Sequence, residues 1–383
     1  MSALDLDLSS DQEMLRDAAA RFIDTALPLP RVRELAESGG DPGPDYEHQA
    51  AELGWFAFLA PEDLGGGSVS GRPVLDAVIL AEERGRALQP GPFVAGNAVV
   101  VALAQAGSEE HRAKVLPGLI SGEAVATWAL ADDQGRWEAA AGVGYSATGP
   151  GFSLSGAKVL VPDAGRADWI LVGAGGDSGP AQFLVAADAP GLTVTRRDGL
   201  DLTRRFDEVT LDGVQVGREA AVGAPGQIDA LADRQLLVAL VLTVAESVGA
   251  MDALFTLALD YARERTAFGR PIGSFQAVKH QLADTSLLLE ESKAVATAAA
   301  RAVADAAGDA SRGTRAAEVA SIAKAFVGDS GISLAQACFQ VFGGIGYTWE
   351  HDLHLFLRRL TVDAALYGAP SWHRERICRL NGI

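Results

Sequence analysis

The spacing of apolar residues changes twice along this 383-residue chain, and that change limits the fold more than any other feature of the sequence. Residues 1–122 place apolar residues at helical spacing, residues 123–222 form short β-rich runs broken by Gly, Pro and Asp, and residues 223–383 return to long helical segments. Each segment is near the usual length of a domain. We therefore predict an α+β multidomain protein with an N-terminal all-α domain, a middle antiparallel β-barrel or sandwich domain, and a C-terminal four-helix bundle.

Local signals predict where some of these elements begin and end. Ser10 and Glu13 have the spacing of a capping box, which indicates the start of the first helix. The C-terminal segment divides into helices over roughly 228–265, 274–308, 313–341 and 350–380. Glycines and a proline separate the first pair at Gly269, Pro271 and Gly273, and glycines separate the last pair at Gly343, Gly344 and Gly346.

Charge and cysteine content exclude several classes of function. The chain has 32 Lys and Arg against 50 Asp and Glu, a net charge of −18, so neither nucleic acid nor an anionic membrane surface is expected as a partner. Cys338 and Cys378 are the only cysteines and have no Cys/His cluster around them, which argues against a disulfide framework and a zinc site. His351 and His354 share a helix face but lack a further ligand type, so no metal site is expected.

The sequence also gives an expectation for the compartment. The N-terminal residues are acidic, whereas a secretory signal begins with basic residues followed by an apolar run. The longest apolar run, residues 236–245, has about half the length that crosses a bilayer. We predict a cytoplasmic protein.

Two glycine-interrupted segments of the C-terminal region have residue types that suit a diphosphate. Residues 261–284 end one helix, turn through Gly-Arg-Pro-Ile-Gly and begin the next, and the beginning of a helix beside arginines attracts phosphate groups. Residues 340–359 place Gly343 and Gly344 just beyond a helix, where the backbone can approach a ligand closely. Glycine-rich turns between helices are also common without any ligand, so spacing alone leaves simple helix boundaries as an alternative.

Both segments resemble the flavin segments of the acyl-CoA dehydrogenase family, and the resemblance covers nearly the whole chain. The family's fold agrees with the α, β, α order, and its members assemble as tetramers through the bundle. The resemblance implies FAD as the cofactor, shared between two subunits, and α,β-dehydrogenation of an acyl-CoA as the reaction. The matching residues that would hold the adenosine diphosphate half of a neighbour's FAD are Arg265, Phe268, Gln276, Gln340, Gly343 and Gly344.

The sequence departs from the family pattern at the residues that would use the flavin. The family's reaction needs a Glu that removes the α-proton of the acyl group. The commonest position of that Glu corresponds to Gly368, and the position used by a second branch corresponds to Ala239. The loop that binds the flavin ring corresponds to residues 131–136 and its Trp-Ile-Thr companion to residues 160–162, and most of the hydroxyls and glycines of both are absent.

Glu246 is the remaining candidate for a catalytic base. It lies seven residues after Ala239, on the same helix face and about 10.5 Å along the axis. Because Glu246 interrupts an apolar helix face it needs a partner, and a buried structural carboxylate paired with an arginine is the alternative.

A chain that keeps the clamp but lacks the base and the ring-binding loop resembles the β-type subunit of actinobacterial heterotetrameric acyl-CoA dehydrogenases. Such enzymes act on bulky CoA thioesters. This resemblance implies an α-type partner subunit that brings the base and the ring-binding domain, with electron-transfer flavoprotein as a further partner. The first alternative is a self-sufficient homomeric acyl-CoA dehydrogenase that uses Glu246. The second is a flavin-free assembly protein, against which Arg265, Gln276 and Gln340 argue.

Overall fold

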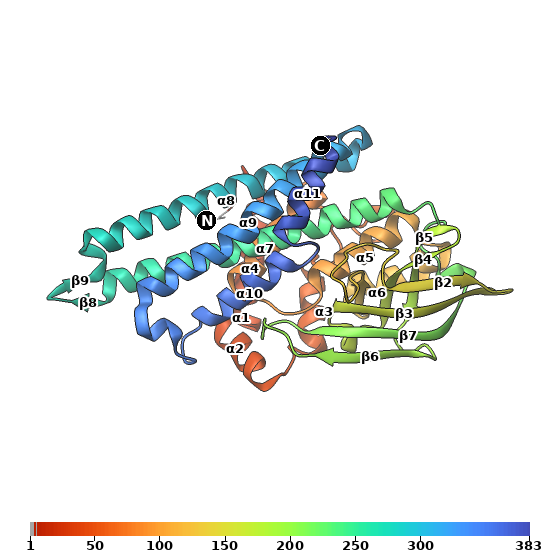
Figure 1. Ribbon diagram of the computed structural model, residues 1–383, viewed down its shortest axis with the longest axis horizontal. Coiled ribbons are helices and arrows are strands. Elements are labelled where there is room, and N and C mark those ends of the chain that lie inside the picture. The colour runs from red at the N-terminus through yellow and green to blue at the C-terminus, as the bar shows by residue number, and fades with distance from the viewer. Residues whose placement is uncertain (1–3, 5) are drawn as a thin grey trace.

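The computed structural model describes residue 4 and residues 6–383, and it places the elements in the predicted α, β, α order (Figure 1). The N-terminal helices and the sheet lie against the long helices of the C-terminal part. The predicted α+β class is therefore confirmed, and the corrections below concern individual elements.

The α-helices of the N-terminal part are α1 Ser10–Ala26, α2 Leu29–Ser38, α3 Pro44–Glu52, α4 Pro73–Arg86, α5 Phe93–Ala106 and α6 Leu116–Ser121, and a longer connection joins α3 to α4. The predicted capping box is wrong by one residue: the Gln12 backbone N–H donates to Ser9 Oγ at 3.3 Å, and the Ser9 N–H donates to Gln12 Oε1 at 3.2 Å. Gln12 is fixed in this role because its amide also donates to the buried Asp76 at 2.9 Å.

Helix α4 crosses the first long helix of the bundle, α7 (Asp229–Glu264), at backbone contact distance. A Cβ built on Gly85 would lie 1.9 Å from the carbonyl oxygen of Glu246, and one built on Gly249 would lie 2.0 Å from the carbonyl oxygen of Glu82. Only glycine leaves room for this approach, so the crossing fixes the N-terminal part on the bundle.

The middle part is one sheet with the order β1-β4-β2-β3-β7-β6, in which β5 also pairs with β4. Its strands are β1 Ala126–Ala129, β2 Val143–Ala147, β3 Gly151–Pro162, β4 Trp169–Gly176, β5 Gly179–Ala186, β6 Leu192–Arg197 and β7 Phe206–Gly217. The antiparallel prediction is wrong in part, because β1 and β2 both pair with β4 in parallel. Alternating apolar residues indicate strands but do not indicate their neighbours.

The bundle consists of α7, α8 (Gln276–Gly308), α9 (Gly313–Phe342), α10 (Leu353–Ala365) and α11 (Pro370–Leu380). The hairpin β8–β9 (Thr266–Ala267 with Arg270–Pro271) joins α7 to α8. The single helix predicted over 350–380 is wrong, because Tyr367 and Gly368 adopt φ of 58° and 110° and end the helical path before Pro370. Helix α7 is long and apolar enough to cross a membrane, and 89% of its most apolar window is buried inside the protein.

Candidate functional site

The two segments predicted to hold a diphosphate meet at one end of the bundle. Arg265 ends α7 and Gly343 ends α9. One turn or less before these ends, the rings of Tyr261 and Phe342 stack with centroids 4.3 Å apart and an interplanar angle of 20°. The β8–β9 hairpin and the α9–α10 connection lie at this same end, on the left in Figure 1.

The predicted clamp residues present unused binding groups at this end. Arg265, Gln276 and Gln340 are exposed, and within the described chain their side chains make no hydrogen bond or ion pair. Phe268 is 95% exposed in a left-handed conformation with φ of 52°. A free guanidinium and two free amides are suitable donors for diphosphate oxygens, and an exposed ring can cover a flat ligand.

The two glycines of the clamp leave their backbone open. Gly343 has φ of 62°, and a Cβ built on Gly343 or Gly344 would meet no atom within 4 Å. The space in front of both is therefore available to a ligand rather than needed for packing. Together with Arg265, these residues fit the adenosine diphosphate half of FAD.

Aromatic side chains lie on both sides of residues 131–136, which correspond to the flavin-ring loop. Trp128 and Trp137 flank residues 131–136 and pack on Tyr367, with ring centroids 6.1 Å and 5.3 Å from it. All three rings are buried. The loop between the two indoles lacks most of the family's hydroxyls and glycines, so its residues do not fit a bound flavin ring.

The ring-loop residues also close on themselves. Asp132 is buried and accepts hydrogen bonds from the backbone N–H of Gln134 at 3.1 Å and of Arg136 at 2.8 Å. The Arg136 Nε donates to the same carboxylate at 2.7 Å. The Asp132 carboxylate and the Arg136 guanidinium are thus engaged with each other within the loop.

The position that corresponds to the usual catalytic Glu has no room for a side chain. A Cβ on Gly368 would lie 2.7 Å from Trp372 Cε3 and 3.0 Å from His373 Nε2, and φ of 110° disfavours any other residue. The Gly368 carbonyl accepts a hydrogen bond from the buried Lys324 Nζ at 3.2 Å. Burial lowers the pKa of His373 to about 3, with further lowering by nearby cationic side chains. Ala239, the second position, lies in the core.

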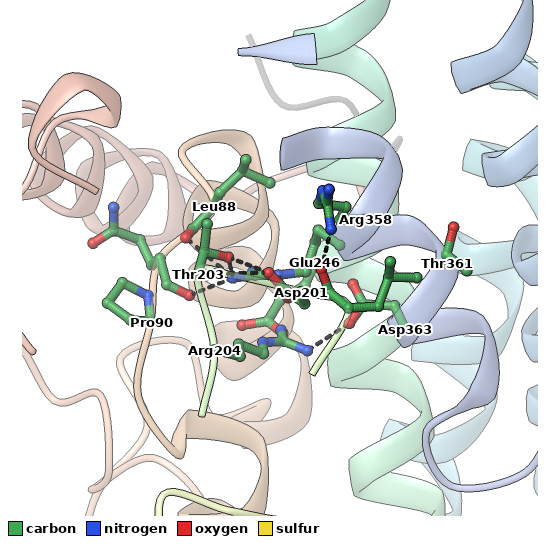
Figure 2. Close-up of polar contacts among 12 residues, drawn as sticks. Leu88, Pro90, Asp201, Thr203, Arg204, Glu246, Arg358, Thr361 and Asp363 are labelled. Atoms are coloured by element: carbon green, nitrogen blue, oxygen red, sulfur yellow. Dashed lines mark hydrogen bonds and ion pairs between the residues drawn. The ribbon is translucent and has the colours of Figure 1, made fainter. Parts of the chain in front are cut away.

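Glu246 is buried between two arginines. Its side chain is 1% exposed, Oε1 accepts a hydrogen bond from Arg84 Nε at 3.1 Å, and Oε2 accepts one from Arg204. Arg204 also pairs with Asp363, and Figure 2 shows its guanidinium between the two carboxylates. Close by, Arg359 Nε donates to Asp201 at 2.6 Å. Glu246 thus has the arginine partner that a structural carboxylate requires.

The space beside Glu246 is too small for an acyl chain. A cavity of about 20 Å³ is lined by Glu246, Arg204, Thr243 and Tyr367, which leaves room for about one water molecule. The two guanidinium groups belong to α4 and to the β6–β7 connection, so residues from the N-terminal and sheet regions close this site over the bundle.

The histidines predicted not to bind metal have other contacts. His351 packs edge-on against Phe342, and His354 stacks on Trp349 with centroids 4.6 Å apart. Over residues 4 and 6–383, no three His, Cys, Asp or Glu side chains are grouped so that they could hold a metal ion.

The aromatic cluster and the two arginines of Glu246 were not predicted from the sequence. Trp128 and Trp137 on either side of the altered loop were a usable signal, because large aromatic side chains that flank a loop usually pack inside the protein. Arg84 and Arg204 gave no such signal, since they are 162 and 42 residues from Glu246.

The N-terminal helical part, the sheet domain and the C-terminal helical bundle have the order found in flavin-dependent dehydrogenases of the acyl-CoA dehydrogenase fold. Residues 9–123 match the acyl-CoA dehydrogenase N-terminal domain, and residues 230–380 match the acyl-CoA dehydrogenase C-terminal domain. The chain belongs to the acyl-CoA dehydrogenase family of FAD-dependent oxidoreductases.

Individual relatives agree with this assignment. The acyl-CoA dehydrogenase IpdE2 of Mycobacterium tuberculosis is 31% identical over 97% of this chain and 96% of its own length. A chain of the ChsE4-ChsE5 complex from Mycobacterium tuberculosis superposes with a TM-score of 0.88 at 27% identity, covering 99% of both chains. A Tcur3481-Tcur3483 steroid ACAD variant superposes with a TM-score of 0.84 at 28% identity, covering 97% of both.

Proposed function

We propose that this chain is the subunit of a heterotetrameric acyl-CoA dehydrogenase that completes the FAD site of an α-type partner subunit. The observation that supports this most is the contrast between its two half-sites. Among the described residues, Arg265, Gln276 and Gln340 are exposed and their side chains have no hydrogen-bond partner. By contrast, the loop over residues 131–136 lacks most of the groups that would bind a flavin ring, and the indoles that flank it, Trp128 and Trp137, pack on Tyr367. A chain of this kind would hold the diphosphate of the partner's FAD and would bind no flavin ring itself.

In this proposal the clamp holds the diphosphate of a FAD whose ring lies on the partner. Arg265 binds the diphosphate oxygens through charge-assisted hydrogen bonds, and Gln276 and Gln340 add neutral ones. Gly343 and Gly344 allow close approach of the backbone. FAD, when bound, accepts the hydride from the β-carbon of the acyl-CoA.

The proposal leaves proton removal to the partner. Gly368 and Ala239 have no acidic group, and both oxygens of Glu246 accept hydrogen bonds from guanidinium groups. The Glu246 carboxylate is therefore already engaged on both sides and is not presented to the α-proton of a substrate. The cavity of about 20 Å³ beside Glu246 also argues against an acyl group on this chain.

The remaining parts of the proposal concern partners and substrate. Two of the similar structures are named as pairs of chains, ChsE4-ChsE5 and Tcur3481-Tcur3483, and the second is named a steroid ACAD. We propose a bulky acyl-CoA as substrate, electron-transfer flavoprotein as electron acceptor, and the cytoplasm as the compartment.

Purification of the chain alone and with a candidate α-type partner tests the proposal. Flavin absorbance against protein concentration gives the FAD content, and light scattering gives the mass. Two chains of each type supply two matched sets of ring site and clamp, so we expect two FAD per α2β2 tetramer. The chain alone should be nearly colourless and inactive, because half of a site loses much of the contact that offsets the entropy of binding.

An active homotetramer that holds four tightly bound FAD would refute the partner role and favour the self-sufficient enzyme that uses Glu246. A folded chain that forms a complex with the α-type partner, but a complex without flavin absorbance, would favour the assembly protein.

A further inference from the structure

A group of buried carboxylates joins the N-terminal part of the chain to the sheet domain. Glu47 belongs to α3, Asp163 follows β3, and Asp207 lies on β7, and all three side chains are buried. Arg166, three residues after Asp163, places its guanidinium 2.7 Å from Glu47 Oε1 and 4.0 Å from Asp163 Oδ1. One guanidinium therefore serves two buried carboxylates that come from different parts of the chain.

Asp163 is the least compensated of these carboxylates. Its side chain is 4% exposed, and its Oδ2 accepts no hydrogen bond within the described part of the chain. Asp207 differs, because its Oδ2 accepts a hydrogen bond from the Gly165 backbone N–H at 2.9 Å. An ionised carboxylate without a donor is costly to bury, whereas a protonated carboxyl group carries no charge. The protonated form of Asp163 therefore suits this site.

The surroundings of Asp163 do not supply the missing positive charge. The charged side chains around it come from both parts of the chain and are Asp41, Glu47, Arg166, Arg196, Arg205 and Asp207. The Arg205 guanidinium is engaged with Asp41 at 3.2 Å and with the Gly39 carbonyl, and Arg196 is exposed on β6. Burial raises the pKa of Asp163 to about 7; Arg166 opposes this rise, and Glu47 and Asp207 add to it.

We propose that a proton on Asp163 keeps α3 and the α2–α3 connection closed on the sheet domain, and that this contact opens when the proton leaves. Loss of the proton leaves two carboxylates at the Arg166 guanidinium, with Asp207 close by. Separation of the two parts then lets water reach the new charge. This device goes beyond the proposed function, because none of its residues belongs to the FAD clamp or to the region of Gly368 and Glu246.

The direction of the pH dependence follows from the pKa of Asp163 in the two forms. In the closed form Asp163 keeps its proton up to about pH 7, whereas an aspartate in water has a pKa of 3.8. The closed form therefore binds the proton more tightly than the open form, and a rise in pH favours opening. Between pH 6 and pH 8 these two values correspond to an increase of about tenfold in the opening equilibrium.

Amide hydrogen exchange of the protein in its purified assembly, followed by mass spectrometry, tests the proposal. Peptides that cover α3 report on opening, because a helix of nine residues is not stable without its packing partners. After correction for the intrinsic exchange rates, opening of α3 should be about tenfold more frequent at pH 8 than at pH 6. Peptides of α9 should show no such change. A constant exchange of α3, or an equal change in α9, would overturn the proposal.

Asp163→Asn assigns the effect to this side chain. Asparagine has nearly the same shape, carries no acid and tolerates the φ of 50° at this position, so α3 should stay closed at both pH values. The control Asp188→Asn removes an exposed carboxylate of the sheet domain and should keep the tenfold dependence. His48 of α3 is exposed and faces the Ser121 carbonyl, so a dependence that came from His48 would survive in Asp163→Asn. That survival, or loss of the dependence in Asp188→Asn, would overturn the role of Asp163.

Discussion

Replacing Gly368 with alanine should destabilise the protein by about 2–5 kcal/mol, and the two parts of that cost can be measured separately. The first part is backbone strain, about 1–2 kcal/mol for a residue with a side chain at positive φ, since Gly368 has φ of 110°. The second is overpacking, typically about 1–3 kcal/mol, because the new Cβ would lie 2.7 Å from Trp372 Cε3 and 3.0 Å from His373 Nε2.

A second glycine provides the matched control. Gly213 has φ of 62°, and a Cβ there would meet no atom within 4 Å, so Gly213→Ala has the strain without the overpacking. Thermal unfolding followed by circular dichroism should give a lower midpoint for Gly368→Ala than for Gly213→Ala. At roughly 2–4 °C per kcal/mol, the overpacking alone corresponds to several degrees.

The outcome also bears on the catalytic position. Equal midpoints for the two variants would refute the packing described around Gly368. With the expected outcome, Gly368→Glu should give no dehydrogenase activity to the chain alone, because its side chain cannot enter without displacing Trp372. A Gly368→Glu variant that is folded, binds FAD and turns over an acyl-CoA would contradict the proposed role.

Further outcomes follow from other residues of the site. Arg265→Ala should lower the FAD affinity of the assembled complex strongly, measured by flavin release on dilution, whereas Arg263→Ala, which removes an exposed arginine of the same helix, should not. Gln340→Ala should have a smaller effect, since a neutral hydrogen bond contributes less. Glu246→Gln should destabilise the chain by about 3–5 kcal/mol because it leaves buried arginines uncompensated, yet turnover per folded complex should stay within a few-fold; a loss of about a hundredfold would identify a general base. The pKa of His373 falls from 6.5 to about 3 on folding, so the unfolded chain binds a proton that the folded chain does not, and the free energy of unfolding should decrease as the pH falls through that interval. A His373→Gln variant that keeps the same dependence in urea titrations would contradict this assignment.

The order of the domains could be predicted from the sequence because hydrophobic period is a local property. Runs at helical spacing and alternating runs are each complete within about ten residues, and both survive in the structure. The break between α10 and α11 was not predicted, although Gly368 and Pro370 were visible in the sequence. The clash that limits Gly368 comes from the packing of Trp372, which residue spacing alone does not give.

The clamp residues could also be proposed from local sequence signals, whereas the contacts around Glu246 could not. Arg265 and Gly343 could be proposed for the clamp from the sequence because each lies in a glycine-marked turn that resembles a family segment. The partners of Glu246 come from distant parts of the chain, so only the requirement for an arginine could be inferred, not which arginine. The aromatic cluster beside the ring loop depends on three side chains that meet only after folding.

The salt-bridge network around Glu246 has a consequence for how the chain acquires its structure. Arg84 comes from the N-terminal helices, Arg204 from the sheet domain, and Glu246 and Asp363 from the bundle. A bundle that formed before the other parts would hold two acidic groups whose guanidinium partners had not yet arrived, and the close crossing at Gly85 and Gly249 would also be missing. The three parts should therefore dock on one another in a single late step of folding. A protease cut in the connection on either side of the sheet domain should give fragments that unfold together.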